Sequence, residues 1–146
     1  MEKLKPRIII TADDFGYCDC RSRGVKACLF SNGGLVSSIS ALVSPSFANG
    51  CLSVRDVLDG STTLGLHLNL TEGLPCCGGA KTLTNDQGQF WDKFELRRRC
   101  DLQMVDNDEI EQEIRAQILQ FEKMFGQFPE HIDGHQVTII CIVLYS

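Results

Sequence analysis

The chain has 146 residues, 43% of them hydrophobic, and its 14 Lys and Arg against 19 Asp and Glu give a formal net charge of −5. This length suits a single domain, and a charged fraction of 23% together with eight Phe argues against a disordered chain. The acidic balance argues against nucleic acid or an anionic membrane surface as a partner, because neither would find a basic patch.

The cysteines and the apolar segments bear on the compartment. None of the eight cysteines forms a C-x-x-C pair, so neither a zinc knuckle nor a thioredoxin-like motif is predicted. The three isoleucines before Thr11 are too few for the apolar core of a signal peptide. The longest apolar run, residues 139–145, is too short for a transmembrane helix, which needs about 20 residues. We therefore expect a reduced, cytoplasmic protein whose cysteines are mostly small hydrophobic residues.

Four stretches predict β-strands. They are rich in β-branched or alternating apolar residues, and turn-forming or polar residues bound them. They are residues 7–12 (RIIITA), 35–43 (LVSSISALV), 63–70 (TLGLHLNL) and His131–Asp133.

Three stretches between these strands predict helices. Residues 20–30 place Val25, Cys28 and Leu29 on one side, with Asn32-Gly33-Gly34 as a stop signal. Residues 45–60 begin at a proline and end at a glycine. Residues 108–125 give the strongest pattern, because Ile110, Ile114, Ile118 and Phe121 recur at helical spacing behind an acidic start.

The order of these elements predicts an α/β fold. Alternating strands and helices imply parallel strands with faces covered by helices. Residues 71–91 form a polar, glycine-containing connection that is longer than most loops, so we expect a functional loop over a site. Its expected anchors are Phe90, Trp91 and Phe94.

Three polar clusters lie near the carboxyl ends of predicted strands. In open parallel sheets and in β/α barrels, active sites form at that end, from residues on several strands. The clusters are Thr11-Ala12-Asp13-Asp14-Phe15-Gly16, Gly65-Leu66-His67-Leu68-Asn69-Leu70-Thr71 and His131-Ile132-Asp133-Gly134-His135.

Taken one at a time, these clusters have ordinary structural explanations. Asp13 and Asp14 could form a turn with a helix cap. A single histidine in an apolar run, such as His67, is more often a core residue than a ligand. His131 and His135 could share a helix face, although the intervening Asp-Gly pair favours a turn.

Taken together, the clusters favour a metal site. All three histidines of the chain fall at predicted strand ends. Two neutral imidazoles and one carboxylate form a facial ligand set that leaves positions open for water.

The three clusters, in this order, resemble the signatures of the YdjC/ChbG family of carbohydrate deacetylases. The matching motifs are TADDFGYC at residues 11–18, GLHLNLTEG at 65–73 and HIDGHQ at 131–136. The resemblance implies a metal-dependent hydrolase on a β/α-barrel-like fold that removes acetyl groups from N-acetylated sugars such as chitooligosaccharides. It also allows a homodimer.

Carried over residue by residue, the resemblance implies specific roles. Asp13 would be the proton acceptor, and Asp14, His67 and His135 would hold the metal, which in this family is magnesium. Imidazole ligands also suit zinc, whereas magnesium prefers oxygen ligands and water. A general acid must protonate the leaving amine; His131 is one candidate, and it could equally support a ligand from behind or be a packed strand residue.

The resemblance extends over residues 7–136. We therefore expect residues 1–136 to be the N-terminal part of a deacetylase domain and residues 137–146 to be a divergent apolar tail. A full β/α barrel typically needs about 250 residues, so only the N-terminal half of one is expected. The alternative to a working deacetylase is a catalytically inactive, truncated form that acts through interactions.

Overall fold

The computed structural model describes residues 8–30, 36–47 and 62–137. Within these residues the strands form one sheet of order β1-β2-β3-β4, in which every neighbouring pair is parallel. The strands are β1 (Thr11–Phe15), β2 (Ser38–Ala41), β3 (Thr63–Leu68) and β4 (Ile132–Gly134). The predicted α/β fold with parallel strands is thus confirmed.

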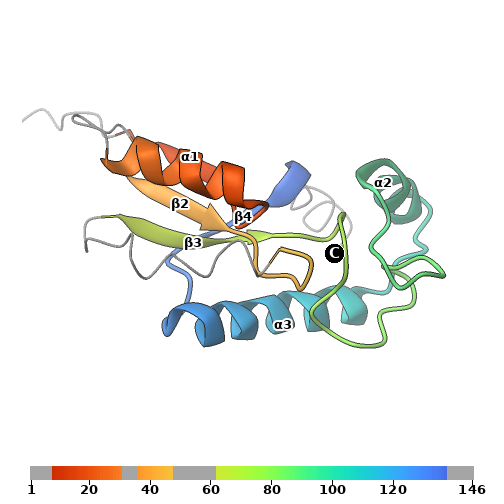
Figure 1. The fold of residues 1–146 in the computed structure, drawn as a ribbon. Coiled ribbons are helices and arrows are strands. Elements are labelled where there is room, and N and C mark those ends of the chain that lie inside the picture. The colour runs from red at the N-terminus through yellow and green to blue at the C-terminus, as the bar shows by residue number, and fades with distance from the viewer. Residues whose placement is uncertain (1–7, 31–35, 48–61, 138–146) are drawn as a thin grey trace, which may run out of the picture.

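Helices occupy the connections between these strands. They are α1 (Asp19–Phe30), α2 (Lys93–Asp101) and α3 (Asn107–Phe125), and a short 3-10 turn, η3 (His135–Val137), follows β4. α1 contacts β1, and α3 contacts β3. Figure 1 shows α2 and the loop before it lying beyond the carboxyl ends of β2 and β3, which the arrowheads mark. No helix in the described residues is both long and apolar enough to cross a bilayer.

Side chains from one face of the sheet form the main core. In a strand, successive side chains point to opposite faces, so alternate apolar residues of β2 and β3 gather on one side. Partly buried residues of α1 and α3, among them Val25, Leu29 and Ile118, pack against this cluster. Its buried members are Phe15, Ile39, Ala41, Val43, Leu64, Leu66, Leu68 and Phe121.

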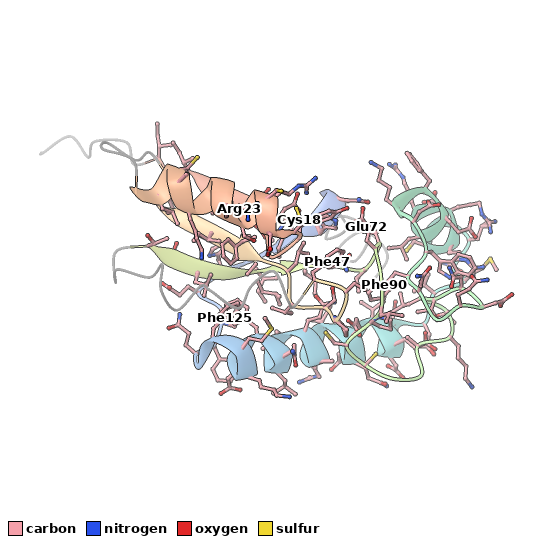
Figure 2. The ribbon with its side chains drawn as sticks, in the orientation of Figure 1. Cys18, Arg23, Phe47, Glu72, Phe90 and Phe125 are labelled. Carbon is pink, nitrogen blue, oxygen red and sulfur yellow. The ribbon has the colours of Figure 1, made fainter. Side chains whose placement is uncertain are left out.

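A second, smaller cluster holds the long connection in place. Phe90 is buried in it and Trp91 packs against it, as expected of two of the anchors. Figure 2 shows Phe90 and Phe125, which belong to the two clusters, toward opposite ends of α3. The buried members of the second cluster are Leu70, Ala80, Leu83, Phe90, Leu96 and Cys100.

The long α3 follows the predicted pattern. Asp106 caps its start by accepting a hydrogen bond from the Asp108 N–H, and Gly126 ends it in the left-handed conformation with φ of 75°. Such a conformation suits glycine, which has no Cβ to clash with the backbone.

Several sequence predictions are wrong in detail. β1 begins at Thr11 rather than at residue 7, and Ile8 and Ile9 are 82% and 76% exposed. β-Branched residues favour a strand, but the pairing partner fixes its bounds, and β2 pairs with β1 only from Thr11 onward. Cys28 is exposed, and Phe94 is 74% exposed because it lies on the solvent side of α2.

The sequence analysis missed α2 altogether. Its start is marked by Asp92, whose carboxylate accepts from the N–H groups of Phe94 and Glu95. An Asp followed three residues later by Glu is a recognisable helix start. Only Leu96 and Cys100 of this helix are buried, so its apolar periodicity is weak.

Some predictions fall outside the described residues. They are the stop signal at 32–34 and most of the helix predicted over 45–60, of which residues 45–47 form a turn. Residues 138–146 of the predicted tail also lie outside them.

Candidate active site

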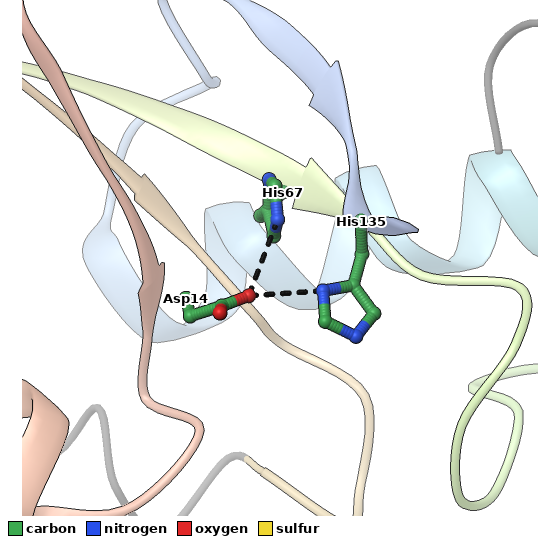
Figure 3. A group of neighbouring side chains, drawn as sticks. All are labelled: Asp14, His67 and His135. Carbon is green, nitrogen blue, oxygen red and sulfur yellow. Dashed lines mark ion pairs between the residues drawn. The ribbon is translucent and has the colours of Figure 1, made fainter. Parts of the chain in front are cut away.

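The structure brings Asp14, His67 and His135 together from three strand ends (Figure 3). Asp14 lies on β1, His67 on β3 and His135 directly after β4. Asp14 Oδ1 is 3.4 Å from His67 Nε2 and 2.9 Å from His135 Nδ1. One ligand atom from each residue lies within 4.8 Å of the others, so a single ion could contact all three. These are the three residues proposed as metal ligands from the sequence.

A local irregularity in β1 turns Asp14 toward the site. The pairing of β1 with β2 shifts register between Ala12 and Phe15, and Asp14 has φ of 58°. A positive φ is uncommon and costly for a residue with a Cβ, and such residues cluster at functional sites. In a regular strand Asp13 and Asp14 would point to opposite faces. Here both line the same cavity.

A carboxylate orients His67 from behind. Asp133 Oδ1 lies 2.7 Å from His67 Nδ1, on the side of the ring opposite the nitrogen that faces Asp14. This arrangement fixes the tautomer that leaves Nε2 available to a metal. Burial raises the pKa of Asp133, but hydrogen bonds from His67 and Ser40 outweigh it, so the pKa is lowered overall.

A second carboxylate lies behind His135. Glu72 Oε2 is 3.6 Å from His135 Nε2, while His135 Nδ1 faces Asp14. Glu72 also accepts a hydrogen bond from the side-chain amide of Gln136. The negative charge of Glu72, and then its hydrogen bond with Tyr17, raise the pKa of the Tyr17 phenol above its ordinary value of 10.0.

Asn69 holds the backbone of Glu72 in place. Its side-chain oxygen accepts from the N–H groups of Thr71 and Glu72, and its amide donates to the Glu72 carbonyl and to Ser44 Oγ. Asn69 is fully buried. The Asn-Leu-Thr sequence at 69–71 therefore has a structural role in shaping the loop that carries Glu72.

The side chains line an open polar cavity of about 310 Å³. The guanidinium of Arg21 lies 2.5 Å from Asp14 Oδ2 and 4.1 Å from the centre of the Tyr17 ring. The carboxylate of Asp14 thus contacts the Arg21 guanidinium through one oxygen and the imidazoles of His67 and His135 through the other. The cavity is lined by Asp13, Asp14, Tyr17, Arg21, His67, Glu72, Gly134, His135 and Gln136.

Asp13 lies beside the three candidate ligands. It is exposed and offers a carboxylate oxygen within 4.8 Å of atoms of His67 and Asp133. Asp13, His67 and Asp133 thus form a second geometric set. We favour the first set as the metal site, because it leaves the hydrogen bond between His67 Nδ1 and Asp133 intact.

The structure places His131 away from the cavity. Its Nε2 lies 3.0 Å from Ser40 Oγ and 3.4 Å from Ser38 Oγ, and its ring is not among the groups that line the cavity. The role of general acid is therefore not supported for His131.

Four cavity residues were missed by the sequence analysis: Tyr17, Arg21, Glu72 and Gln136. Three of them stand inside the quoted motifs, so the motifs themselves held the signal. Arg21 comes from the first turns of α1, and no pattern in the sequence marked it.

The fold and the site define an α/β protein with a parallel sheet and a candidate metal-binding triad at its strand ends, and comparisons with known proteins give its family. A family model described as "YdjC-like protein" matches residues 7–144, which include most of the apolar tail. The carbohydrate deacetylase of Danio rerio is 37% identical over 138 residues, 93% of this chain and 43% of that protein. The chitooligosaccharide deacetylase of Serratia marcescens is 35% identical over 137 residues, 92% of this chain and 50% of that protein.

A solved structure has a similar fold over the matched residues. A protein of Enterococcus faecalis V583, provisionally assigned to cellobiose-phosphate cleavage, superposes with a TM-score of 0.73 at 32% identity. The match covers 88% of this chain and 48% of that one. The chain therefore belongs to the YdjC-like protein family, and it spans about half the length of the curated relatives it matches.

Proposed function

We propose that this chain carries the metal-binding and proton-accepting groups of a carbohydrate deacetylase that acts on N-acetylated oligosaccharides. The observation that carries the proposal is the convergence of Asp14, His67 and His135 within 4.8 Å, with Asp13 in the same cavity. The names of the relatives from Danio rerio and Serratia marcescens support the substrate class.

The donor set fits a divalent cation. Two imidazole nitrogens and one carboxylate oxygen suit zinc, cobalt or iron, and three protein ligands leave positions open for water and substrate. Magnesium is the ion implied by the family resemblance, with zinc as the alternative that these donors favour. A cation held there would polarise the amide carbonyl and acidify a bound water.

Side chains of this chain would accept the proton of the attacking water and support the metal ligands. Asp13 can accept a proton from the attacking water, because it is exposed, lines the same cavity and is not one of the three proposed ligands. Asp133 keeps the His67 imidazole oriented through a hydrogen bond, and the Glu72 carboxylate lies 3.6 Å from His135 Nε2. Arg21 neutralises the oxygen of Asp14 that faces away from the imidazoles.

The test separates catalysis from metal binding. With an N-acetylated chitooligosaccharide and either magnesium or zinc, Asp13→Asn should lower acetate release by about 100-fold or more, the usual contribution of a general base. Isothermal titration with the metal should show unchanged binding in this variant. Asp86→Asn, an exposed carboxylate outside this cavity, is the matched control for both measurements.

Two results would contradict the proposal. If Asp13→Asn releases acetate as fast as the unaltered chain, Asp13 is not the proton acceptor. If the unaltered chain binds metal and releases no acetate, the alternative of an inactive form that acts through interactions is favoured.

A further inference from the structure

The sheet has a polar face opposite its apolar core. Ser40 of β2 is paired in register with Gly65 of β3, and His67 of β3 is paired with Asp133 of β4. Ser38 and Ser40 are 1% and 0% exposed, although neither belongs to the apolar cluster. Buried hydroxyls need hydrogen-bond partners. The partners of Ser40 form one chain of hydrogen bonds, from His131 through Ser40 and Asp133 to His67, whereas Ser38 contacts His131 alone.

The chemistry of the groups fixes which one donates in each hydrogen bond of this chain. Ser40 Oγ donates to Asp133 Oδ2 at 2.6 Å and lies 3.0 Å from His131 Nε2. A hydroxyl has only one proton, so Ser40 must accept from an N–H of His131. Asp133 then uses its other oxygen, Oδ1, to accept from His67 Nδ1 at 2.7 Å. His131 thus donates to Ser40 Oγ, Ser40 donates to Asp133 Oδ2, and His67 donates to Asp133 Oδ1.

The sequence leaves room for His131 at Gly65. A Cβ on Gly65 would lie 2.3 Å from two atoms of the His131 ring, a distance that real side chains do not reach. The absence of a side chain at position 65 lets the ring lie directly against β3. Gly65 is thus explained by the close approach of His131, although its backbone does not need the freedom of glycine.

We propose that His131 and Ser40 are positioning residues that act on His67 through Asp133. His131 orients the Ser40 hydroxyl, which binds Asp133 Oδ2 and so keeps Oδ1 aimed at His67 Nδ1. This fixes the His67 tautomer that directs Nε2 toward Asp14. The inference deepens the proposed function and rests on its metal site. It gives His131 a role that requires no access to the substrate.

The first readout is the hydrogen bond itself. In the full-length chain without metal, proton NMR should show the His67 Nδ1–H as a downfield signal protected from solvent exchange. Ser40→Ala and His131→Phe should shift this signal upfield and speed its exchange. Ser38→Ala is the matched control, because Ser38 contacts His131 but makes no bond to Asp133. His131→Gln keeps an N–H donor and should restore most of the signal.

The second readout is zinc or cobalt affinity by isothermal titration. Loss of a group that orients a metal-bound histidine typically weakens binding about 10–100-fold, which we expect for Asp133→Asn. Ser40→Ala and His131→Phe should weaken binding by a smaller factor and change the visible spectrum of bound cobalt. Ser38→Ala should match the unaltered chain.

The outcomes separate this inference from the proposed function. If Ser40→Ala and His131→Phe keep both the protected proton and the metal affinity of the unaltered chain, the positioning role is overturned. If the unaltered chain binds no metal, the proposed function fails, and the proton signal alone decides the inference. If His131→Phe is too unstable to study, Ser40→Ala and His131→Gln still decide it.

Discussion

At the level of single residues, the site depends on one unusual backbone position. Asp14 adopts φ of 58°, and the register shift in β1 beside it lets two consecutive carboxylates line one cavity. Bulges of this kind often occur next to active sites, where they re-aim a side chain. The division of work proposed for Asp13 and Asp14 follows from this irregularity, because a regular strand would separate them by the thickness of the sheet.

Glu72 and Tyr17 give a residue-scale prediction about pH. The charge of Glu72, and then its hydrogen bond, raise the pKa of Tyr17 above 10.0. Glu72→Gln removes the charge, so the pKa of Tyr17 should fall toward 10.0. In the unaltered chain the raised pKa keeps the Tyr17 phenol neutral to a higher pH. In the variant, ionisation of Tyr17 should therefore begin at a lower pH.

The measurement is a spectrophotometric titration of phenolate absorbance. The chain has two tyrosines, so Tyr145→Phe is included throughout to leave Tyr17 as the single chromophore. Glu111→Gln serves as the control, since its carboxylate is exposed and paired with Arg115 on α3. An identical Tyr17 titration in Glu72→Gln and Glu111→Gln would refute the coupling between Glu72 and Tyr17.

At the level of elements, α3 fastens the loop that supplies Glu72. Glu113 is fully buried and accepts from the N–H groups of Cys76 and Cys77 at 2.9 and 2.8 Å. One turn later, Gln117 exchanges two hydrogen bonds with the backbone of Asn69. Burial, followed by the charge or hydrogen bond of Glu113, raises the pKa of both thiols to about 12. These two cysteines therefore stay protonated at neutral pH.

Glu113 gives the element-scale prediction. Glu113→Gln replaces one acceptor oxygen by an amide donor that faces backbone N–H groups, so one buried donor loses its partner. We expect a loss of about 1–3 kcal/mol in the free energy of unfolding, measured by urea denaturation with an unchanged slope. Glu111→Gln, two residues away on the exposed side of the same helix, should change it by less than about 0.5 kcal/mol. Equal midpoints for the two variants would contradict the clamping role of Glu113.

The sequence predicts elements well where their own residues define them. α3 carries its acidic start and its apolar spacing within the segment itself, and both were readable in advance. β1 was placed too early, because the isoleucines at 8–10 favour a strand but β2 pairs with Thr11–Phe15. α2 was missed, since only two of its residues are buried and its start depends on one capping carboxylate.

The candidate site shows the same division. The clusters that hold Asp13, Asp14, His67 and His135 could be picked out because they lie at predicted strand ends, and the resemblance to the YdjC/ChbG family singled out these four residues within them. The contacts of Glu72 with His135 and of Arg21 with Asp14 depend on how loops and helices fold over the sheet. The tie between Ser40 and Asp133 joins residues 93 positions apart, and only the pairing of the strands brings them together.

At the level of the whole molecule, this chain covers about half the length of its relatives, and that half holds all three proposed ligands. They come from the first, third and fourth strands of one sheet, so the site forms only when these strands are paired. Metal binding and folding of the sheet should therefore be coupled, because a ligand that binds only the folded state stabilises it.

The whole-molecule prediction follows from this coupling. At a zinc or magnesium concentration of about 100 times the dissociation constant, the folded chain should gain roughly 2.7 kcal/mol and melt at a higher temperature. His67→Ala should abolish the gain, because it removes a ligand from the middle of the sheet. Cys100→Ala is a control that leaves the donor set intact, and it should lower the melting temperature without changing the response to metal. Calorimetric melting of the purified chain, with and without metal, is the measurement.

If His67→Ala gains as much stability from metal as the unaltered chain, the ion binds elsewhere, and the convergence of the three strand ends has another cause. Calorimetry distinguishes these results because a site built from three strand ends is lost in the same unfolding transition that separates the strands.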